Sequence, residues 1–275
     1  MIAQEAALSH YEEEQIQRIN EWQTEAPSVF SKTLEATLSP MTWLLEKIIP
    51  GSAIQGILQC SNVAAEWVSD TEDIQQSAQV MDIEELRQKD LGLSDKLAND
   101  VHNWAIGLAS LEGGASGAVG WFGMAVDIPT IITLALRTIH KIGACYGYER
   151  ESKEDGEFIL AILSASGANN MEQKITALTS LRSIEKMIAS QTWAALSQKA
   201  VENKISQEAA AVSIKALASQ LGVNLTRRKV LQVIPAVGAA VGASVNAWYI
   251  KEVGWTARRA FQERWLVDNN KIIRN

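Results

Sequence analysis

Apolar residues recur every three or four positions along most of the 275-residue chain, which is the spacing of an amphipathic helix. No segment alternates apolar and polar residues for long enough to predict a strand. We therefore expect an all-α fold. Because no linker strong enough to divide domains interrupts this pattern, residues 1–275 are predicted to form a single multi-helix domain.

Two apolar segments, residues 104–139 and 230–250, depart from the amphipathic pattern and are rich in glycine and alanine. The first carries only Glu112 and Asp127 as charges before Arg137, and the second carries none. We predict that the helical body is organised around these two segments.

Glycines recur at intervals of three or four residues within these segments. On a helix this spacing leaves one face without side chains, so that another backbone can approach closely. Each interior glycine costs about 0.5 to 1 kcal/mol relative to alanine in an exposed helix, so close packing or an apolar surround is expected to compensate. These helix-packing glycines are Gly113, Gly117, Gly120 and Gly123 in the first segment and Gly238 and Gly242 in the second.

Capping residues predict where several helices begin and end. Ser94 is expected to cap a helix that runs into the first apolar segment, and Asp127, followed by Ile-Pro, to start the next helix. Gly147 is a candidate for the residue just after that helix. Ser152 has capping-box spacing to an aspartate and opens a predicted helix that extends to about Ser166.

The same periodicity predicts helices in other parts of the chain. An acidic amphipathic helix is expected over residues 3–24 and ends before Pro27, and a polar helical stretch broken near Met81 is expected over residues 70–88. The second apolar segment is predicted to continue as a helix to Leu266. Shorter helices are expected at about residues 41–48, 51–68, 171–189, 191–203, 206–221 and 224–234.

The charge of the chain bears on which kinds of molecule it could bind. The net charge of −7 argues against nucleic acid, because phosphate neutralisation needs clustered lysine and arginine. The predicted basic C-terminal helix, about residues 251–275, holds six bases against three acids, and this excess could face anionic lipid headgroups. A solvated helix face explains the same excess.

Tryptophans border both apolar segments. Indole rings gather at membrane–water interfaces, where they lie at the level of the headgroups. Core packing explains the same positions equally well. The candidate membrane-interface residues are Trp104, Trp121, Trp248, Trp255, Arg258 and Arg259.

Several polar residues lie in or beside the apolar segments, where an unpaired buried charge would be costly. One interpretation is a polar pocket that binds a small ligand or holds a buried acid. The alternative is that each polar group finds its own partner. Asp127 would then cap a helix, Arg137 would pair with a carboxylate, and Asn246 would form an interhelix hydrogen bond. The residues of this candidate cluster are Glu112, Asp127, Arg137, Tyr146 and Asn246.

No arrangement typical of an enzyme site is found in the sequence. The histidines, His10, His102 and His140, are too scattered for a metal site, and no nucleophile elbow or phosphate-binding loop is present. Cys60 and Cys145 have no CxxC or metal-ligand spacing, and Cys145 is expected to be a buried structural thiol. We predict no catalytic residue, no cofactor and no metal, and keep enzyme activity only as an alternative.

The two apolar segments are also poorly suited to span a membrane permanently. The 21 residues of segment 230–250 would form a helix of about 31 Å, enough for a hydrocarbon core of about 30 Å. Glu112 and Asp127 of the first segment would each oppose insertion by about 2.5 to 3.5 kcal/mol, so a constitutive span is not expected. The N-terminus lacks the basic and apolar regions of a secretory signal. A cytoplasmic location is therefore predicted, with peripheral attachment to the inner membrane as an option.

Two sets of motifs in this sequence resemble those of the EcsC family. They are residues 112–120 (EGGASGAVG), 127–129 (DIP) and 146–148 (YGY), and then residues 234–243 (IPAVGAAVGA) and 264–266 (RWL). The resemblance extends from about Tyr11 to Leu266, with one departure among the small residues at 114–116. It implies a bacterial helical protein of a family that takes its name from a protein encoded beside an ATP-driven transporter. It implies no particular reaction.

Three functions remain open from the sequence. The first is a membrane-associated, non-catalytic helical protein that binds a membrane surface or a membrane-protein partner, which the apolar segments, the tryptophans and the basic C-terminus favour. The second is a membrane-perturbing or pore-forming toxin or effector, similar in plan to channel-forming colicins. The third is a small-ligand binding module or enzyme that uses the polar cluster. No oligomeric state is predicted.

Overall fold

The computed structural model describes residues 7–26, 71–118, 121–149, 153–168, 170–197 and 238–273, with side chains except at 112–129, 153, 189–197 and 238–245. Within these ranges the chain forms α-helices and one 3-10 helix and no strand, which confirms the all-α class. The elements are α1 (His10–Thr24), α6 (Glu72–Ala78), η2 (Ile83–Gln88), α7 (Leu91–Ala118), α8 (Trp121–Cys145), α9 (Lys153–Ser166), α10 (Met171–Ser197) and α12 (Gly238–Asp268).

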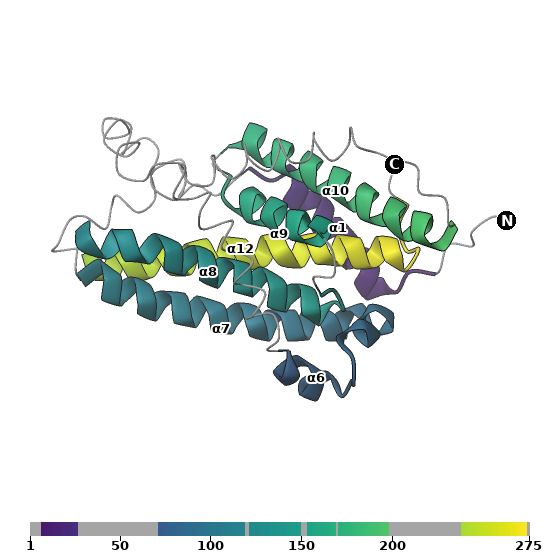
Figure 1. Ribbon diagram of the computed structural model, residues 1–275, viewed down its shortest axis with the longest axis horizontal. Helices are drawn as coiled ribbons and strands as arrows, with labels where there is room; N and C mark the ends of the chain where they lie inside the picture. The colour runs from purple at the N-terminus through teal and green to yellow at the C-terminus, as the bar shows by residue number, and fades with distance from the viewer. Residues whose placement is uncertain are drawn as a thin grey trace.

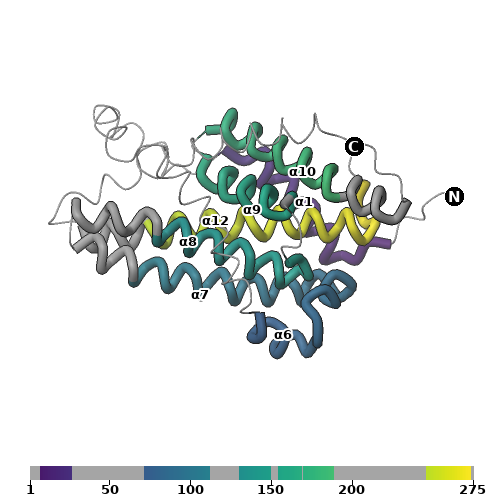
Figure 2. The backbone as a smooth tube through the Cα atoms, in the orientation of Figure 1, coloured from purple at the N-terminus to yellow at the C-terminus, as the bar shows by residue number. Residues whose placement is uncertain are grey.

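Helix α12 is the central element of the described fold. Figure 1 shows it between the α7 and α8 pair on one side and α9 and α10 on the other, with α6 beneath α7 and α8. The backbone path in Figure 2 shows the same order. Its most extensive contacts are with α7, and it also packs against α8, α9 and α1. At 31 residues, α12 is about 46 Å long at about 1.5 Å per residue, long enough to contact all these elements.

Phe261 of α12 joins the helices in the core. Its ring centroid lies 5.4 Å from that of Phe158 on α9, and 6.4 Å and 5.8 Å from those of Tyr146 and Tyr148 after α8. A methyl group on Gly143 of α8 would come within 2.7 Å of the Phe261 ring. A side chain at position 143 would therefore force α8 away from α12.

A second glycine allows α7 and α12 to pack closely. A methyl group on Gly254 of α12 would overlap the imidazole of His102 on α7. Gly143 and Gly254 are therefore close-packing glycines inside helices, and Gly147, just after α8, lies equally close to Arg87. The six glycines predicted from the apolar segments lie outside the part of the chain with described side chains, so the prediction for Gly113, Gly117, Gly120, Gly123, Gly238 and Gly242 stays a prediction.

Several predicted helix ends are confirmed. Gly147 has a φ of +87°, and the Gly147 and Tyr148 N–H groups donate to the carbonyls of Ala144 and Gly143, both at 2.9 Å. This arrangement satisfies the last carbonyls of α8. Helix α9 ends at Ser166, and the polar stretch breaks between α6 and η2, as expected. Ser152, the predicted cap of α9, lies outside the described residues.

Two predicted helix starts are wrong. Helix α7 begins at Leu91, where the Asp90 side chain accepts a hydrogen bond from the Gly92 N–H at 2.9 Å, so Ser94 lies inside the helix and is fully buried. Helix α8 begins at Trp121 and runs through Asp127 and its Ile-Pro. An interior proline costs roughly 3 kcal/mol, and the packing of α8 against α7 and α12 offsets that cost.

The predicted bounds of three other helices also change. The first helix begins at His10 instead of residue 3, because Ser9 forms a capping box with Glu12. Helix α10 continues through the boundary predicted near residue 190. The C-terminal helix ends at Asp268 and does not extend to residue 275. The helices predicted at 41–48, 51–68, 206–221 and 224–234 lie outside the described residues.

Candidate functional site

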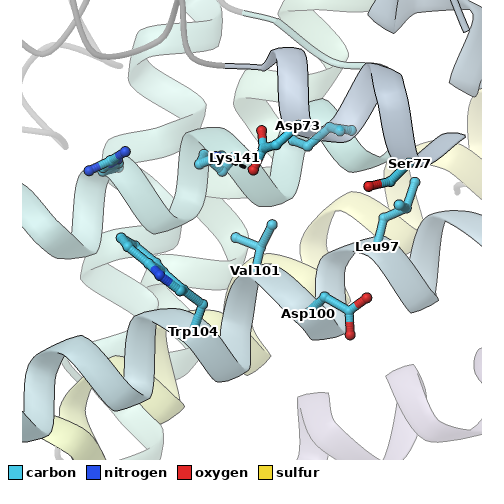
Figure 3. Close-up of a pocket in the computed structure, with 9 residues that line it drawn as sticks. Asp73, Ser77, Leu97, Asp100, Val101, Trp104 and Lys141 are labelled. Carbon is cyan, nitrogen blue, oxygen red and sulfur yellow. Dashed lines mark hydrogen bonds and ion pairs between the residues drawn. The ribbon is translucent and has the colours of Figure 1, made fainter. Parts of the chain in front are cut away.

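A groove of about 430 Å³ opens between α6, α7 and α8 (Figure 3). Its walls combine apolar side chains with two acids and two bases. The lining residues are Asp73, Ile74 and Ser77 of α6, Leu97, Asp100, Val101 and Trp104 of α7, and Arg137 and Lys141 of α8. The volume lies in the range of small-molecule sites.

The charged side chains of each wall of the groove have the same sign. Asp100 and Trp104 are four residues apart on α7, and Arg137 and Lys141 are four residues apart on α8, so each pair shares one helix face. The Lys141 ammonium donates to Asp73 at 2.7 Å and thereby fastens the short helix α6 to α8. The cations of the groove thus come from α8, and the carboxylates come from α6 and α7.

Arg137 lies against the exposed indole of Trp104. Its guanidinium carbon is 5.3 Å from the centre of the ring. Trp104 is 53% exposed, which is unusual for so large an apolar side chain. A cation over an indole contributes roughly 0.5 to 1 kcal/mol at an exposed site. Both residues of this pair line the groove.

An exposed apolar stripe on α7 leads away from the groove. Trp104, Gly107 and Leu111 follow one another at spacings of three and four residues and therefore share a helix face. Leu111 is 74% exposed. A methyl group on Gly107 would meet nothing within 4 Å. The stripe is therefore open to solvent along its described length.

The stripe points toward the end of the body where both apolar segments meet. Successive hydrogen bonds join Asp95 to Gln262 at 2.6 Å, Asn99 to Arg258 at 3.1 Å and His102 to the Lys251 carbonyl at 3.0 Å, so α7 and α12 run antiparallel. This register brings the C-terminal end of α7 level with the N-terminal end of α12.

Two residues separate the end of α7 from the start of α8, so the N-terminal end of α8 lies at the same place (Figure 1). We call this region the apolar end: residues 105–118 of α7, 121–136 of α8 and 238–250 of α12. Its sequence contains two charged residues, Glu112 and Asp127.

A second polar feature is a buried network around Asp95, which is 3% exposed. Its carboxylate accepts hydrogen bonds from the hydroxyls of Tyr146 and Tyr11, the latter at 2.5 Å, and from the Gln262 amide at 2.6 Å. Three donors from α1, from α12 and from the end of α8 thus satisfy one carboxylate of α7. These three hydrogen bonds offset the free-energy cost of burying the Asp95 carboxylate.

The network continues to Arg259. Its guanidinium donates to the side-chain carbonyls of Gln15 at 3.0 Å and of Gln262 at 2.7 Å. Burial lowers the pKa of Arg259, and the positive charge of Arg258 lowers it further. The polar face of α1 therefore covers a cation of α12.

Burial also changes the acidity of other groups in the core. It raises the pKa of Tyr146 well above its usual value, and the charge of Asp95 adds to the shift. Burial raises the pKa of the Cys145 thiol, which donates to the Lys141 carbonyl at 3.2 Å. Cys145 is fully buried, as expected for a structural thiol. Both groups remain protonated at neutral pH, so neither is poised as a nucleophile.

The predicted polar cluster does not come together among the described side chains. Arg137 lines the groove, whereas Tyr146 is fully buried beside Asp95. Asn246 is 1% exposed in α12. Glu112 and Asp127 lie on α7 and α8, with side chains outside the described part.

The candidate membrane-interface residues lie in different environments. Trp104 and Trp255 are exposed, and Trp248 is partly buried against the core. Arg258 and Arg259 are each 8% exposed, so most of each side chain lies inside the fold, and their place at a membrane interface stays a prediction. Both guanidiniums lie over the Trp255 ring and bond to amide side chains inside the fold. The side chain of Trp121 lies outside the described part.

Sequence reasoning missed the centre of the buried network. Asp95 lies on the apolar face of α7, in register with Leu91, Ala98 and His102. A carboxylate at a core position of an amphipathic helix signals a buried partner. That signal was present, but the hydrogen-bond partners of Asp95, which are Tyr11, Tyr146 and Gln262, are too distant in sequence to be paired with it by spacing.

The described residues contain neither a membrane-spanning helix nor a cluster of metal ligands. No helix there is both long and apolar enough to cross a membrane. No group of three or more histidine, cysteine, aspartate or glutamate side chains there is arranged to hold a metal ion.

Comparison with known proteins finds related sequences. The model of the EcsC protein family matches residues 13–266. From Bacillus subtilis (strain 168), the uncharacterized protein YdbA is 24% identical over 191 residues, 69% of this chain and 64% of that protein. The protein EcsC of the same strain is 24% identical over 159 residues, 58% of each chain. This chain thus matches less than two thirds of the length of either relative. No solved structure matches it.

Proposed function

The chain belongs to the EcsC protein family, and from this premise we propose that it attaches to a membrane surface through its apolar end and acts without catalysis. The observation that carries the proposal is the contact between Trp104 and Arg137 where the apolar end begins, with the guanidinium carbon 5.3 Å from the ring. An exposed tryptophan beside cations is the composition of membrane-interface anchors.

The distance along the helices supports this placement. Helix α7 continues from Trp104 to Ala118, about 21 Å at about 1.5 Å per residue. One leaflet with its headgroups is about 20 to 22 Å thick. With Trp104 and Arg137 at the level of the headgroups, the exposed Leu111 would therefore lie at the depth of the acyl chains.

The two acids of the apolar end limit how far it enters. Glu112 and Asp127 would each cost about 2.5 to 3.5 kcal/mol at the middle of a bilayer. Attachment to one leaflet keeps both acids away from the bilayer centre, whereas a span would not. Surface binding is therefore favoured over the pore-forming alternative. The small-ligand alternative loses support because the predicted polar cluster is divided between the groove and the core.

Flotation of the purified chain with vesicles that contain an encapsulated dye tests the proposal. We expect the protein to float with anionic vesicles and the dye to stay inside. Dye release at the same protein concentration would favour the membrane-perturbing alternative. Absence of flotation with both anionic and neutral vesicles would contradict attachment to lipid and direct the search to a membrane-protein partner.

A further inference from the structure

We infer that helix α1 is a detachable strap, which leaves the body of the protein as a unit while α7, α8, α9 and α12 stay folded. This inference does not depend on membrane attachment. Helix α1 lies beside α12 (Figure 1) and also bonds to side chains of α10. Its detachment uncovers Arg259, the cation of α12 that the polar face of α1 covers.

The inner face of α1 is mostly polar. The buried residues of this helix are Glu12, Gln15 and Ile19, and two of the three are polar. Ile16 and Trp22 are partly buried against the core. Because apolar burial provides most of the free energy that holds one helix against another, a helix with so little of it is easier to detach.

Helix α9 shows the contrast. It has 14 residues, against 15 in α1, so the two helices are close in length. Hydrophobic contacts hold α9 to the body, whereas hydrogen bonds to polar and charged groups hold α1. The buried apolar residues of α9 are Phe158, Ile159, Ala161, Ile162, Leu163 and Ala165.

Lys174 of α10 holds the C-terminal end of α1. Its ammonium donates to the carbonyls of Trp22 and Glu25, the latter at 2.7 Å. Lys174 is 7% exposed, and this burial lowers its pKa. An ammonium is strongly hydrated in water, so detachment of α1 restores hydration that offsets part of the lost hydrogen bonding.

Lys271, which follows α12, holds the other end of α1. It donates to the Ala7 carbonyl at 2.8 Å and pairs with Glu12 at 3.3 Å. Glu12 also accepts a hydrogen bond from the Ser9 N–H at 2.6 Å, so its carboxylate keeps a partner within the α1 segment. Breaking the contact at this end therefore leaves no buried charge without a partner.

The body keeps partners for the buried groups that α1 contacts. Without Tyr11, the Asp95 carboxylate still accepts a hydrogen bond from the Gln262 amide at 2.6 Å. Without Gln15, the Arg259 guanidinium still donates to Gln262 at 2.7 Å, and the charge of Asp95 still favours its charged form. Both charged groups thus keep a hydrogen bond with α1 attached or detached, which lowers the cost of detachment.

Hydrogen exchange of the full chain at neutral pH, followed by mass spectrometry, tests the inference. An isolated helix of this length is only marginally stable in water, so the amides of α1 exchange whenever it detaches. We expect the amides in the middle of α1 to exchange at least about tenfold faster than those of α7 and α12. Equal rates in the three helices would mean that α1 opens only in global unfolding, and would overturn the inference.

A variant in the inner face of α1 shows whether the helix opens as a unit. Ile19→Ala removes a buried apolar side chain and should accelerate exchange along the whole of α1 by about tenfold or more, with α7 and α12 unchanged. Ile175→Ala removes a 55% exposed side chain from α10 and should exchange like the wild type. Acceleration confined to the residues next to position 19, or equal acceleration in α12, would contradict a strap that detaches as a unit.

Discussion

The guanidinium carbon of Arg137 lies 5.3 Å from the centre of the Trp104 ring and joins a cation of α8 to an exposed aromatic of α7. This contact brings together one residue predicted for a polar cluster and one predicted for a membrane interface. Both residues line the groove and lie next to the start of the apolar end. The proposed attachment to a membrane depends on it more than on any other pair.

Replacing the indole should weaken membrane binding. Trp104→Ala removes both the apolar surface and the support of the Arg137 guanidinium. A loss of about 1.4 kcal/mol, about tenfold in affinity, is expected from the area and the cation–aromatic contact. Vesicle titration measures it. Ile175→Ala, which removes a 55% exposed side chain from α10, should bind like the wild type. Equal losses in both variants would argue against a role specific to Trp104.

The acid stability of the fold should depend on His102. Burial, together with the charge of Arg258, lowers the pKa of its imidazole to about 4, whereas an unfolded chain has a histidine pKa of about 6.5. Between these values the unfolded state binds more protons, so the free energy of unfolding decreases as pH falls from about 6.5 to about 4. The total loss is on the order of 3 kcal/mol.

Denaturant titrations across this pH range provide the test for His102. His102→Gln should flatten the part of the profile due to the imidazole. His10→Gln serves as the control, because the His10 side chain is 98% exposed and should contribute little. A profile for His102→Gln with the wild-type slope would show that the imidazole is not the titrating group.

Two glycines in neighbouring helices should respond to alanine in opposite directions. Gly143→Ala would place a methyl group 2.7 Å from the buried Phe261 ring and should destabilise the protein by about 1 to 3 kcal/mol. Gly107→Ala meets open space within α7 and should stabilise it by about 0.5 to 1 kcal/mol. Thermal unfolding of both variants checks the signs. A stable Gly143→Ala protein would mean that α8 and α12 are not so closely packed.

The buried network should be sensitive to one hydroxyl. Tyr146→Phe removes a donor to the Asp95 carboxylate in the core, and a hydrogen bond to a charged group contributes about 1.5 to 3 kcal/mol. Tyr11→Phe removes a donor to the same carboxylate from a ring that is 38% exposed, and water can replace it. Chemical denaturation should therefore give the larger loss for Tyr146→Phe. The reverse order would contradict the network.

Local features of the fold were predictable from the sequence. The helix class follows from the periodicity, and Gly147 ends α8 because a left-handed residue is required there. The start of α8 was not predictable in the same way. Asp127 with its Ile-Pro satisfies every local rule for a helix start, yet tertiary packing extends the helix back to Trp121.

The site was less predictable because it depends on contacts between distant residues. Arg258 and Arg259 look like a basic surface in the sequence, and only the folded chain brings Asn99 and Gln15 against them. Trp104 and Arg137 were each singled out separately. Their contact follows from the antiparallel pairing of α7 and α8, which turns two candidate features into one site.

The position of Leu111 relative to the bilayer tests membrane attachment most directly. An environment-sensitive fluorophore at Leu111→Cys, with Cys60 replaced by serine and Cys145 protected by burial, would report on the apolar stripe. On addition of anionic vesicles we predict a blue shift and quenching by acyl-chain spin labels, with neither for the same probe at Ile175→Cys. A protein that floats while the Leu111 probe stays in water would contradict attachment through the apolar end.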